Sequence, residues 1–174
     1  MILPLVEKIK VGFQGEAQAT FGEQNGNMHA VVPEDDCIIN QVFTAAVAFD
    51  GTNNSFLNSA PVAVQQLAQA VLHAAYEGTI LSAIAKNKKK VVLTLIGGGV
   101  FNNKLSWIAY SIEKLKQVIE SHNIDVTLVI FDSTSGSIKS QIPDFISRMR
   151  KIVRETQGTH ILYSSKNPGG VIIT

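Results

Sequence analysis

The chain has 174 residues, of which 45% are hydrophobic and 17% are charged, and its formal net charge is +1. This length suits a single domain with one core, and the composition is too apolar for an intrinsically disordered chain. No apolar run approaches the roughly 18 residues that a membrane span requires, and the near-neutral charge excludes a polyanion-binding footprint over the whole chain. We therefore expect one soluble domain over residues 1–174, without a membrane or nucleic-acid partner.

The start of the chain and its cysteine content bear on the cellular compartment. Met1 is followed by a short apolar stretch and then Glu7, without the basic start, long apolar stretch and cleavage site of a signal peptide. Cys37 is the only cysteine, so the chain can form neither an internal disulfide nor a thiolate metal cluster. Both features favour a cytoplasmic protein.

Strand and helix patterns alternate from residue 41 onward, whereas glycines and amides interrupt residues 1–40, which predict only short strands and loops. Continuous apolar runs rich in strand formers predict strands, and apolar residues three and four positions apart predict helices. In chain order, the patterns predict a strand over 41–49, a helix from Pro61 to about Asn87, a strand over 91–96, a helix from an Asn103 cap to about Ser121, a strand over 126–131, a helix over 138–156 and a strand over 160–163.

This alternation is typical of a parallel sheet built through right-handed crossovers. Residues 91–96 also lack the polar alternation of a half-exposed strand, which is typical of a strand covered on both faces. We expect an α/β fold of three layers, in which helices cover both faces of a mostly parallel, mixed sheet. Ligands bind such sheets at the carboxyl ends of the strands. The loops after Phe49, Ile96, Phe131 and Tyr163 should therefore meet at one edge.

Three consecutive glycines, Gly97–Gly99, stand between the strand over 91–96 and the next helix. Glycine lets an anion approach the backbone, and the N–H groups and positive dipole end of a helix N-terminus favour a phosphate there. Two commoner phosphate loops do not match: the sixth position from Gly97 is Asn102 rather than the glycine of the dinucleotide fingerprint, and no Gly-Lys-Ser/Thr of an ATP-binding P-loop follows. The loop predicts a phosphate site of another kind, with a merely tight turn as the alternative.

Several segments occur in the order found in macrodomains, the ADP-ribose-binding α/β modules. They are Ala75–Leu81, Gly97–Asn103, Trp107–Ile108 and Phe131–Asp132, and the likeness covers roughly residues 41–132. In this part, the chain resembles the second half of a macrodomain.

The resemblance implies a macrodomain-like fold, a function and a set of ligand contacts. The glycine loop would hold the diphosphate of ADP-ribose, with an aromatic residue beside the distal ribose, and residues after the next strand would lie near the adenosine. The ligand-binding residues so implied are Gly97, Gly98, Gly99, Val100, Phe101, Asn102, Phe131 and Asp132. The implied partner is ADP-ribose or an ADP-ribosylated protein, and no further cofactor is expected.

Residues 1–40 depart from the macrodomain pattern, because they contain neither its Asn-Ala-Ala-Asn-like motif nor its upstream glycine-rich loop. Asn167, Gly169 and Gly170, after the last predicted strand, have the composition of that missing loop, and we add them to the expected ligand contacts. A glycine turn between two terminal strands would explain the same residues.

Hydrolysis of an ADP-ribosyl bond needs a water held near the anomeric carbon and commonly oriented by a carboxylate or amide. Asp50 and Asn54, together with Asn53, follow the strand over 41–49 and are the expected catalytic residues, although these residue types also form ordinary turns. No two of the four histidines have metal-ligand spacing, so no metal site is expected. The alternatives are an ADP-ribose reader without turnover, and a Rossmann-like protein that binds another nucleotide or has a structural role.

Overall fold

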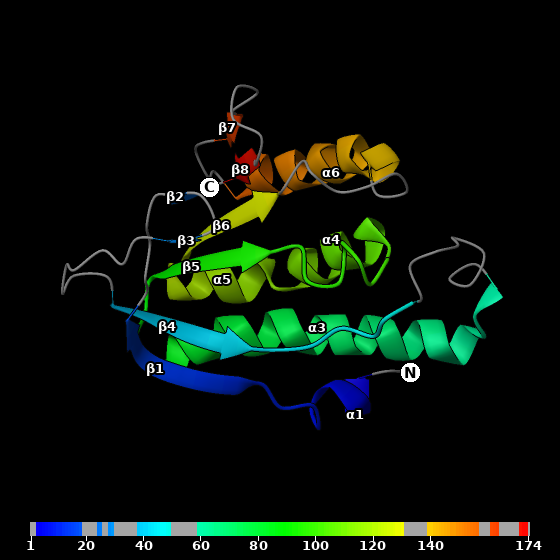
Figure 1. Ribbon diagram of the computed structural model, residues 1–174, viewed down its shortest axis with the longest axis horizontal. Helices are drawn as coiled ribbons and strands as arrows, with labels where there is room; N and C mark the ends of the chain where they lie inside the picture. Colours follow the sequence, from blue (N-terminus) through cyan, green and yellow to red (C-terminus); the bar gives the residue numbers. More distant parts are fainter. Residues whose placement is uncertain are drawn as a thin grey trace. The chain divides into compact units, whose positions relative to one another are not determined.

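The chain divides into two units, residues Val11–Thr44 and the combination of Met1–Lys10 with Ala45–Thr174. The computed structural model describes residues 3–18, 24–25, 28–29, 38–49, 59–130, 139–156, 161–163 and 171–173. Each unit has its own β-structure (Figure 1).

The described part of the smaller unit consists of two short antiparallel pairs. β1 (Gly12–Gln18) pairs with β4 (Ile38–Phe43), and the register of this pair shifts midway along β1. β2 (Gln24–Asn25) pairs with β3 (Met28–His29). These pairs confirm the short strands that were expected in residues 1–40.

The strand predicted over 41–49 is wrong in its extent. β4 ends at Phe43, and residues 44–49 belong to no helix or strand. Residues 45–49 lie in the larger unit, where backbone groups of Val47 and Phe49 hydrogen-bond to a loop and its side chains rather than to a strand. The apolar run 41–49 is therefore divided between the two units: residues 41–43 belong to β4 in the smaller unit, and residues 45–49 belong to the larger unit.

Helices alternate with strands in the larger unit, as the sequence pattern predicted. Its elements are α1 (Leu3–Val6), α3 (Val62–Ala85), β5 (Lys90–Thr94), α4 (Leu105–Lys114), α5 (Lys116–His122), β6 (Asp125–Ile130), η1 (Lys139–Gln141), α6 (Ile142–Glu155), β7 (Ile161–Tyr163) and β8 (Val171–Ile173). The helix expected from Asn103 to Ser121 is divided at Leu115 into α4 and α5. The long α3 is rich in alanine and contains no proline, and both properties favour a helix.

The sheet of the larger unit is mixed and has the strand order β5-β6-β8-β7. β5 and β6 are parallel, whereas β8 is antiparallel to both of its neighbours, so β5, β6 and β7 run in the same direction. The chain is thus an α/β protein with a mixed sheet, but the prediction of a mostly parallel sheet is wrong for the described strands, because only β5 and β6 pair in parallel. The antiparallel pairing of β7 with β8 also agrees with the alternative interpretation of the residues between them, two terminal strands joined by a turn.

The main core lies between one face of this sheet and the helices α3, α4 and α6, where α4 packs against both α3 and α6 (Figure 1). Alternate residues of β5 and β6 point into the core, which includes Tyr76, Ile80, Val91, Leu93, Ile108, Leu128, Ile130, Phe145 and Met149. Each large apolar side chain that is fully buried contributes about 1.5–3 kcal/mol relative to its exposed state.

The opposite face of β5 is open in the part of the chain that the structure describes. Val91 and Leu93 are buried, but Val92, between them, is 66% exposed. The described helices that contribute to the core all pack on the Val91 side, so coverage of this strand on both faces stays a prediction.

Candidate functional site

The glycine loop begins at the carboxyl end of β5, where a buried tyrosine fixes the backbone. The Tyr76 hydroxyl of α3 donates a hydrogen bond to the Thr94 carbonyl oxygen (2.8 Å) and accepts one from the Ile96 amide (3.1 Å). Tyr76 is fully buried, and burial raises its pKa well above the ordinary value of 10.0. The hydroxyl thus stays protonated as a donor, and it holds the chain in place just before Gly97.

Gly97 and Gly98 are glycines for reasons internal to the fold. Gly97 has a φ of +72°, and a Cβ there would lie 2.5 Å from the Ala46 Cβ and 2.7 Å from the Asn103 Nδ2. A Cβ on Gly98 would lie 3.0 Å from the side chains of both Leu105 and Ile108. At these two positions, a tight turn explains the glycines without a ligand.

Asn103 connects the loop to residues 45–49. Its side chain is fully buried, and Nδ2 donates to the carbonyl oxygens of Val47 (2.9 Å) and Gly97 (3.1 Å). The Phe49 amide also donates to the Phe101 carbonyl oxygen (3.0 Å). These bonds place residues 45–49 along the glycine loop.

The expected role of Asn103 as a helix cap is wrong. The N-cap of α4 is Lys104, which forms no side-chain cap hydrogen bond. Instead, the Leu105 amide donates to Oε1 of Gln141 at the start of α6 (3.0 Å). The capping group therefore comes from a different helix, and the start of α6 is tied to the glycine loop region.

The outer part of the loop, Gly99–Phe101, is open. No heavy atom lies within 4 Å of a Cβ built on Gly99, and Val100 and Phe101 are 86% and 43% exposed. Within the described part of the chain, the amides of these three residues form no hydrogen bond. They precede the N-terminus of α4, whose dipole attracts negative charge. The loop can therefore offer three adjacent N–H donors to an anion.

Aromatic and cationic side chains flank the loop at the start of α4. The rings of Phe49 and Trp107 meet edge to face, with their centroids 6.0 Å apart. The Lys104 ammonium lies 5.3 Å from the centroid of the Trp107 ring. Trp107 is half-buried and also packs against both neighbouring hydrophobic clusters.

The structure brings together only part of the predicted site. Gly97, Gly98, Gly99, Val100, Phe101 and Asn102 lie on the loop just described. Outside the described residues lie Asp50, Asn53, Asn54, Phe131, Asp132, Asn167, Gly169 and Gly170, as does Cys37. Two described residues, each before or after one of these segments in the sequence, bond to the loop or to the helix that follows it. The Phe49 amide donates to the Phe101 carbonyl oxygen, and Gln141 Oε1 accepts from the Leu105 amide.

A surface hollow lies elsewhere, over the amino-terminal halves of β5 and β6 beside α5 and α6. Its floor includes Val91, Leu93 and Leu128, which are only 7%, 2% and 4% exposed. The hollow has a volume of about 920 Å³ and lies over the end of β5 that is away from the glycine loop. Ligands of parallel sheets bind at the opposite, carboxyl ends of the strands.

Among the described residues, no three histidine, cysteine, aspartate or glutamate side chains gather as metal ligands would. Over the same part of the chain, no helix has the length and apolar character needed to cross a membrane.

Comparison of the chain with models of protein families, with curated proteins and with solved structures found no match. Inferences about the ligand therefore depend on the residues of the loop and their geometry.

Proposed function

We propose that this protein binds ADP-ribose, or an ADP-ribosylated protein, through the loop Gly97–Asn102. The diphosphate would accept hydrogen bonds from the amides of Gly99, Val100 and Phe101. The observation that carries this proposal is Gly99, which has no neighbour that would exclude a side chain, whereas Gly97 and Gly98 do. Glycine loses more conformational entropy on folding than other residues, and at position 99 no packing contact requires it. Close approach of a ligand to the backbone would explain why this residue is glycine.

The surroundings of the loop suit a ligand with a charged and an apolar part. The helix dipole and Lys104 favour negative charge near the start of α4. Phe101, 43% exposed, offers an aromatic surface beside the open amides, where the distal ribose would pack. Both features agree with the ligand that the macrodomain resemblance implies.

The proposal includes a macrodomain-like, three-layer fold in a cytoplasmic protein. In such a fold, a further layer would cover the side of β5 on which Val92 is exposed. Phe131 and Asp132 would then serve the adenosine, and Asn167, Gly169 and Gly170 would serve as the upstream glycine loop.

Titration calorimetry with ADP-ribose, beside AMP and NAD, tests the binding function. Trp107 is the only tryptophan, and its place beside the loop makes its fluorescence a second readout. We expect selective micromolar binding of ADP-ribose, and its loss in Gly99→Glu, which puts bulk and negative charge at the open amides. Gln117→Glu on the exposed face of α5 makes the same charge change and should bind normally. Tight binding of another phosphate ligand, without a response to ADP-ribose, would instead identify a different nucleotide-binding protein.

Hydrolysis of the ADP-ribosyl bond is an extension of the same proposal. The Phe49 amide is bonded to the loop at Phe101, and Asp50 follows Phe49 in the sequence. Release of ADP-ribose from modified proteins should therefore be lost in Asp50→Ala or Asn54→Ala while ADP-ribose affinity is kept. If the unaltered protein binds ADP-ribose but releases none, it is a reader of the modification.

A further inference from the structure

The outer face of α6 concentrates positive charge. The apolar side of this helix, which includes Phe145 and Met149, packs into the core. The opposite side exposes Ser147, Arg150, Lys151 and Arg154, which we call the α6 basic face. These residues are three and four positions apart, so they share one stripe of the helix, and together with Asp144 and Arg148 they line a hollow.

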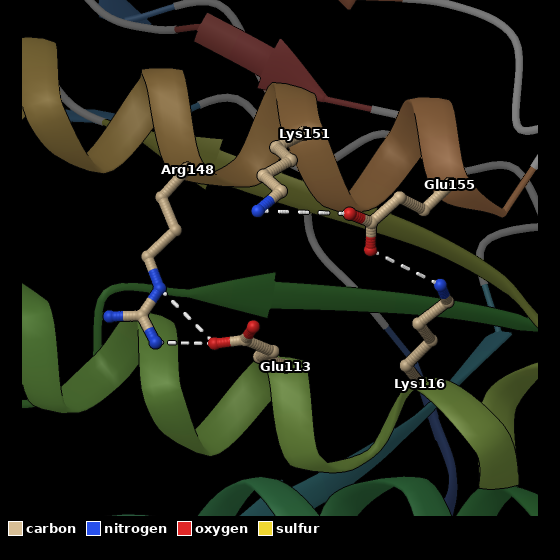
Figure 2. Close-up of polar contacts among 5 residues, drawn as sticks. All are labelled: Glu113, Lys116, Arg148, Lys151 and Glu155. Carbon is tan, nitrogen blue, oxygen red and sulfur yellow. Dashed lines mark hydrogen bonds and ion pairs between the residues drawn. The ribbon is translucent and has the colours of Figure 1, made fainter.

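Neighbouring acidic side chains neutralise only the edge of this stripe (Figure 2). Arg148 forms an ion pair with Glu113 of α4. The Glu155 carboxylate forms ion pairs with the ammonium groups of Lys116 of α5 (N···O 3.4 Å) and Lys151 (N···O 3.9 Å). Because Glu155 is shared by two lysines, it can compensate the charge of only one of them. These pairs lie on the side of α6 that faces α4 and α5.

Two arginines of the α6 basic face are left without a counter-charge. Within the described part of the chain, Arg150 and Arg154 form no ion pair and no hydrogen bond through their side chains. They stand one turn apart, a spacing at which like charges repel and weaken a helix. The helix dipole favours Arg154, in the last turn, but Arg150 lies outside that turn. The stability of α6 itself therefore does not explain why Arg150 and Arg154 are both arginines.

The charge is also local to this helix. α6 contains the cations Arg148, Arg150, Lys151 and Arg154 and the acids Asp144 and Glu155, an excess of two positive charges. The whole chain has a net charge of +1. The remainder of the protein is thus slightly acidic, so an acidic partner would be attracted to α6 in preference to the rest of the chain.

We propose that the α6 basic face docks an acidic peptide segment of a partner protein. The Cα atoms of Arg150 and Arg154 are separated by about 6 Å along the helix axis. Alternate residues of an extended peptide are about 7 Å apart, so two carboxylates at every second position can each meet one guanidinium. Guanidinium groups bind carboxylates through two parallel hydrogen bonds, and the Ser147 hydroxyl adds a donor one turn away. The stripe is too short for the six to ten phosphate contacts of a duplex nucleic acid.

Fluorescence anisotropy tests the docking surface, with a labelled extended peptide that has glutamate at alternate positions, at low ionic strength. Arg150→Gln with Arg154→Gln should weaken binding about tenfold or more, whereas Lys88→Gln with Lys90→Gln makes the same charge change elsewhere and should have little effect. Glutamine is a good helix former, and circular dichroism checks that both variants are folded. Arg150→Lys with Arg154→Lys keeps the charge but not the paired geometry and should bind with intermediate affinity.

Several outcomes would overturn the proposal: no binding of the glutamate peptide, equal losses in the two glutamine variants, or tighter binding of a single-stranded oligonucleotide of matched charge. ADP-ribose does not enter this measurement, so its result is independent of the function proposed for the glycine loop.

Discussion

Alanine substitutions at the three glycines of the loop should separate structural from ligand-related reasons for glycine. Gly97→Ala combines a positive φ, which costs about 1–2 kcal/mol, with a Cβ only 2.5 Å from the Ala46 Cβ. Overpacking of this kind costs about 1–3 kcal/mol, so we expect a loss of about 2–5 kcal/mol in the free energy of unfolding. Gly98→Ala meets side chains at 3.0 Å and should lose about 1–3 kcal/mol.

Gly99→Ala should behave in the opposite way. Its φ is not positive and its Cβ meets no atom within 4 Å, so alanine should raise the free energy of unfolding by about 0.4–1 kcal/mol, because it restricts the unfolded chain. The new methyl group would nevertheless stand where a phosphate must approach. We expect ADP-ribose affinity to fall at least about tenfold, the equivalent of one weakened charge-assisted hydrogen bond.

Urea denaturation followed by circular dichroism measures the stability of each variant, and calorimetry measures its affinity for ADP-ribose. The informative result is Gly99→Ala, which should be the most stable of the three variants and yet a poor binder. A Gly99→Ala protein as destabilised as Gly98→Ala would show that the loop needs this glycine for folding. Unchanged affinity in a stable Gly99→Ala protein would remove the open amides from the proposed site.

Substitutions at three further residues test contacts around the loop. Tyr76→Phe should cost about 1–3 kcal/mol at neutral pH, measured by urea denaturation, because the Thr94 carbonyl oxygen loses its buried donor. Folding raises the pKa of Tyr76, so its contribution to the free energy of unfolding is complete below the unfolded value of 10.0 and declines as the pH rises above it. The difference in stability between the unaltered protein and Tyr76→Phe should therefore shrink above pH 10.0. A difference that stays constant with pH would contradict the raised pKa. Asn103→Ala should lower the free energy of unfolding by about 2–4 kcal/mol, because two partly buried carbonyl oxygens lose their donor and a cavity forms where the buried side chain was. Thermal unfolding near that of the unaltered protein would disprove this role. Gln141→Ala should cost about 1 kcal/mol by leaving the Leu105 amide uncapped, whereas Gln141→Glu, which keeps the acceptor, should cost less in the same denaturation assay.

Periodicity was sufficient to predict the elements that carry a continuous apolar face. The helices expected from Pro61 to Asn87 and over 138–156 correspond to Val62–Ala85 and Ile142–Glu155. The central strands were likewise expected within one or two residues of their observed bounds. For α6, the apolar stripe that predicted the helix includes Phe145 and Met149, which pack into the core.

Contacts between distant parts of the sequence could not be predicted in this way. Asn103 looked like a helix cap, but its main partner, Val47, is 56 residues away, and the cap is supplied by Gln141, at the start of α6. The break at Leu115 has no glycine or proline to signal it. For the candidate site, the sequence identified the glycine loop as a unit, but only the space around each residue distinguishes Gly99 from Gly97 and Gly98.

The position of β8 between β6 and β7 has a consequence for how the protein is made. β6 can pair with β5 as soon as both have left the ribosome, but its other neighbour is Val171–Ile173, which is translated after α6 and β7. Until then, a strand that contains Leu128 and Ile130 has an unpaired edge, and such edges readily pair with other chains. The nascent protein should therefore be most prone to aggregation, and most in need of a chaperone, during synthesis of the segment between β6 and β8.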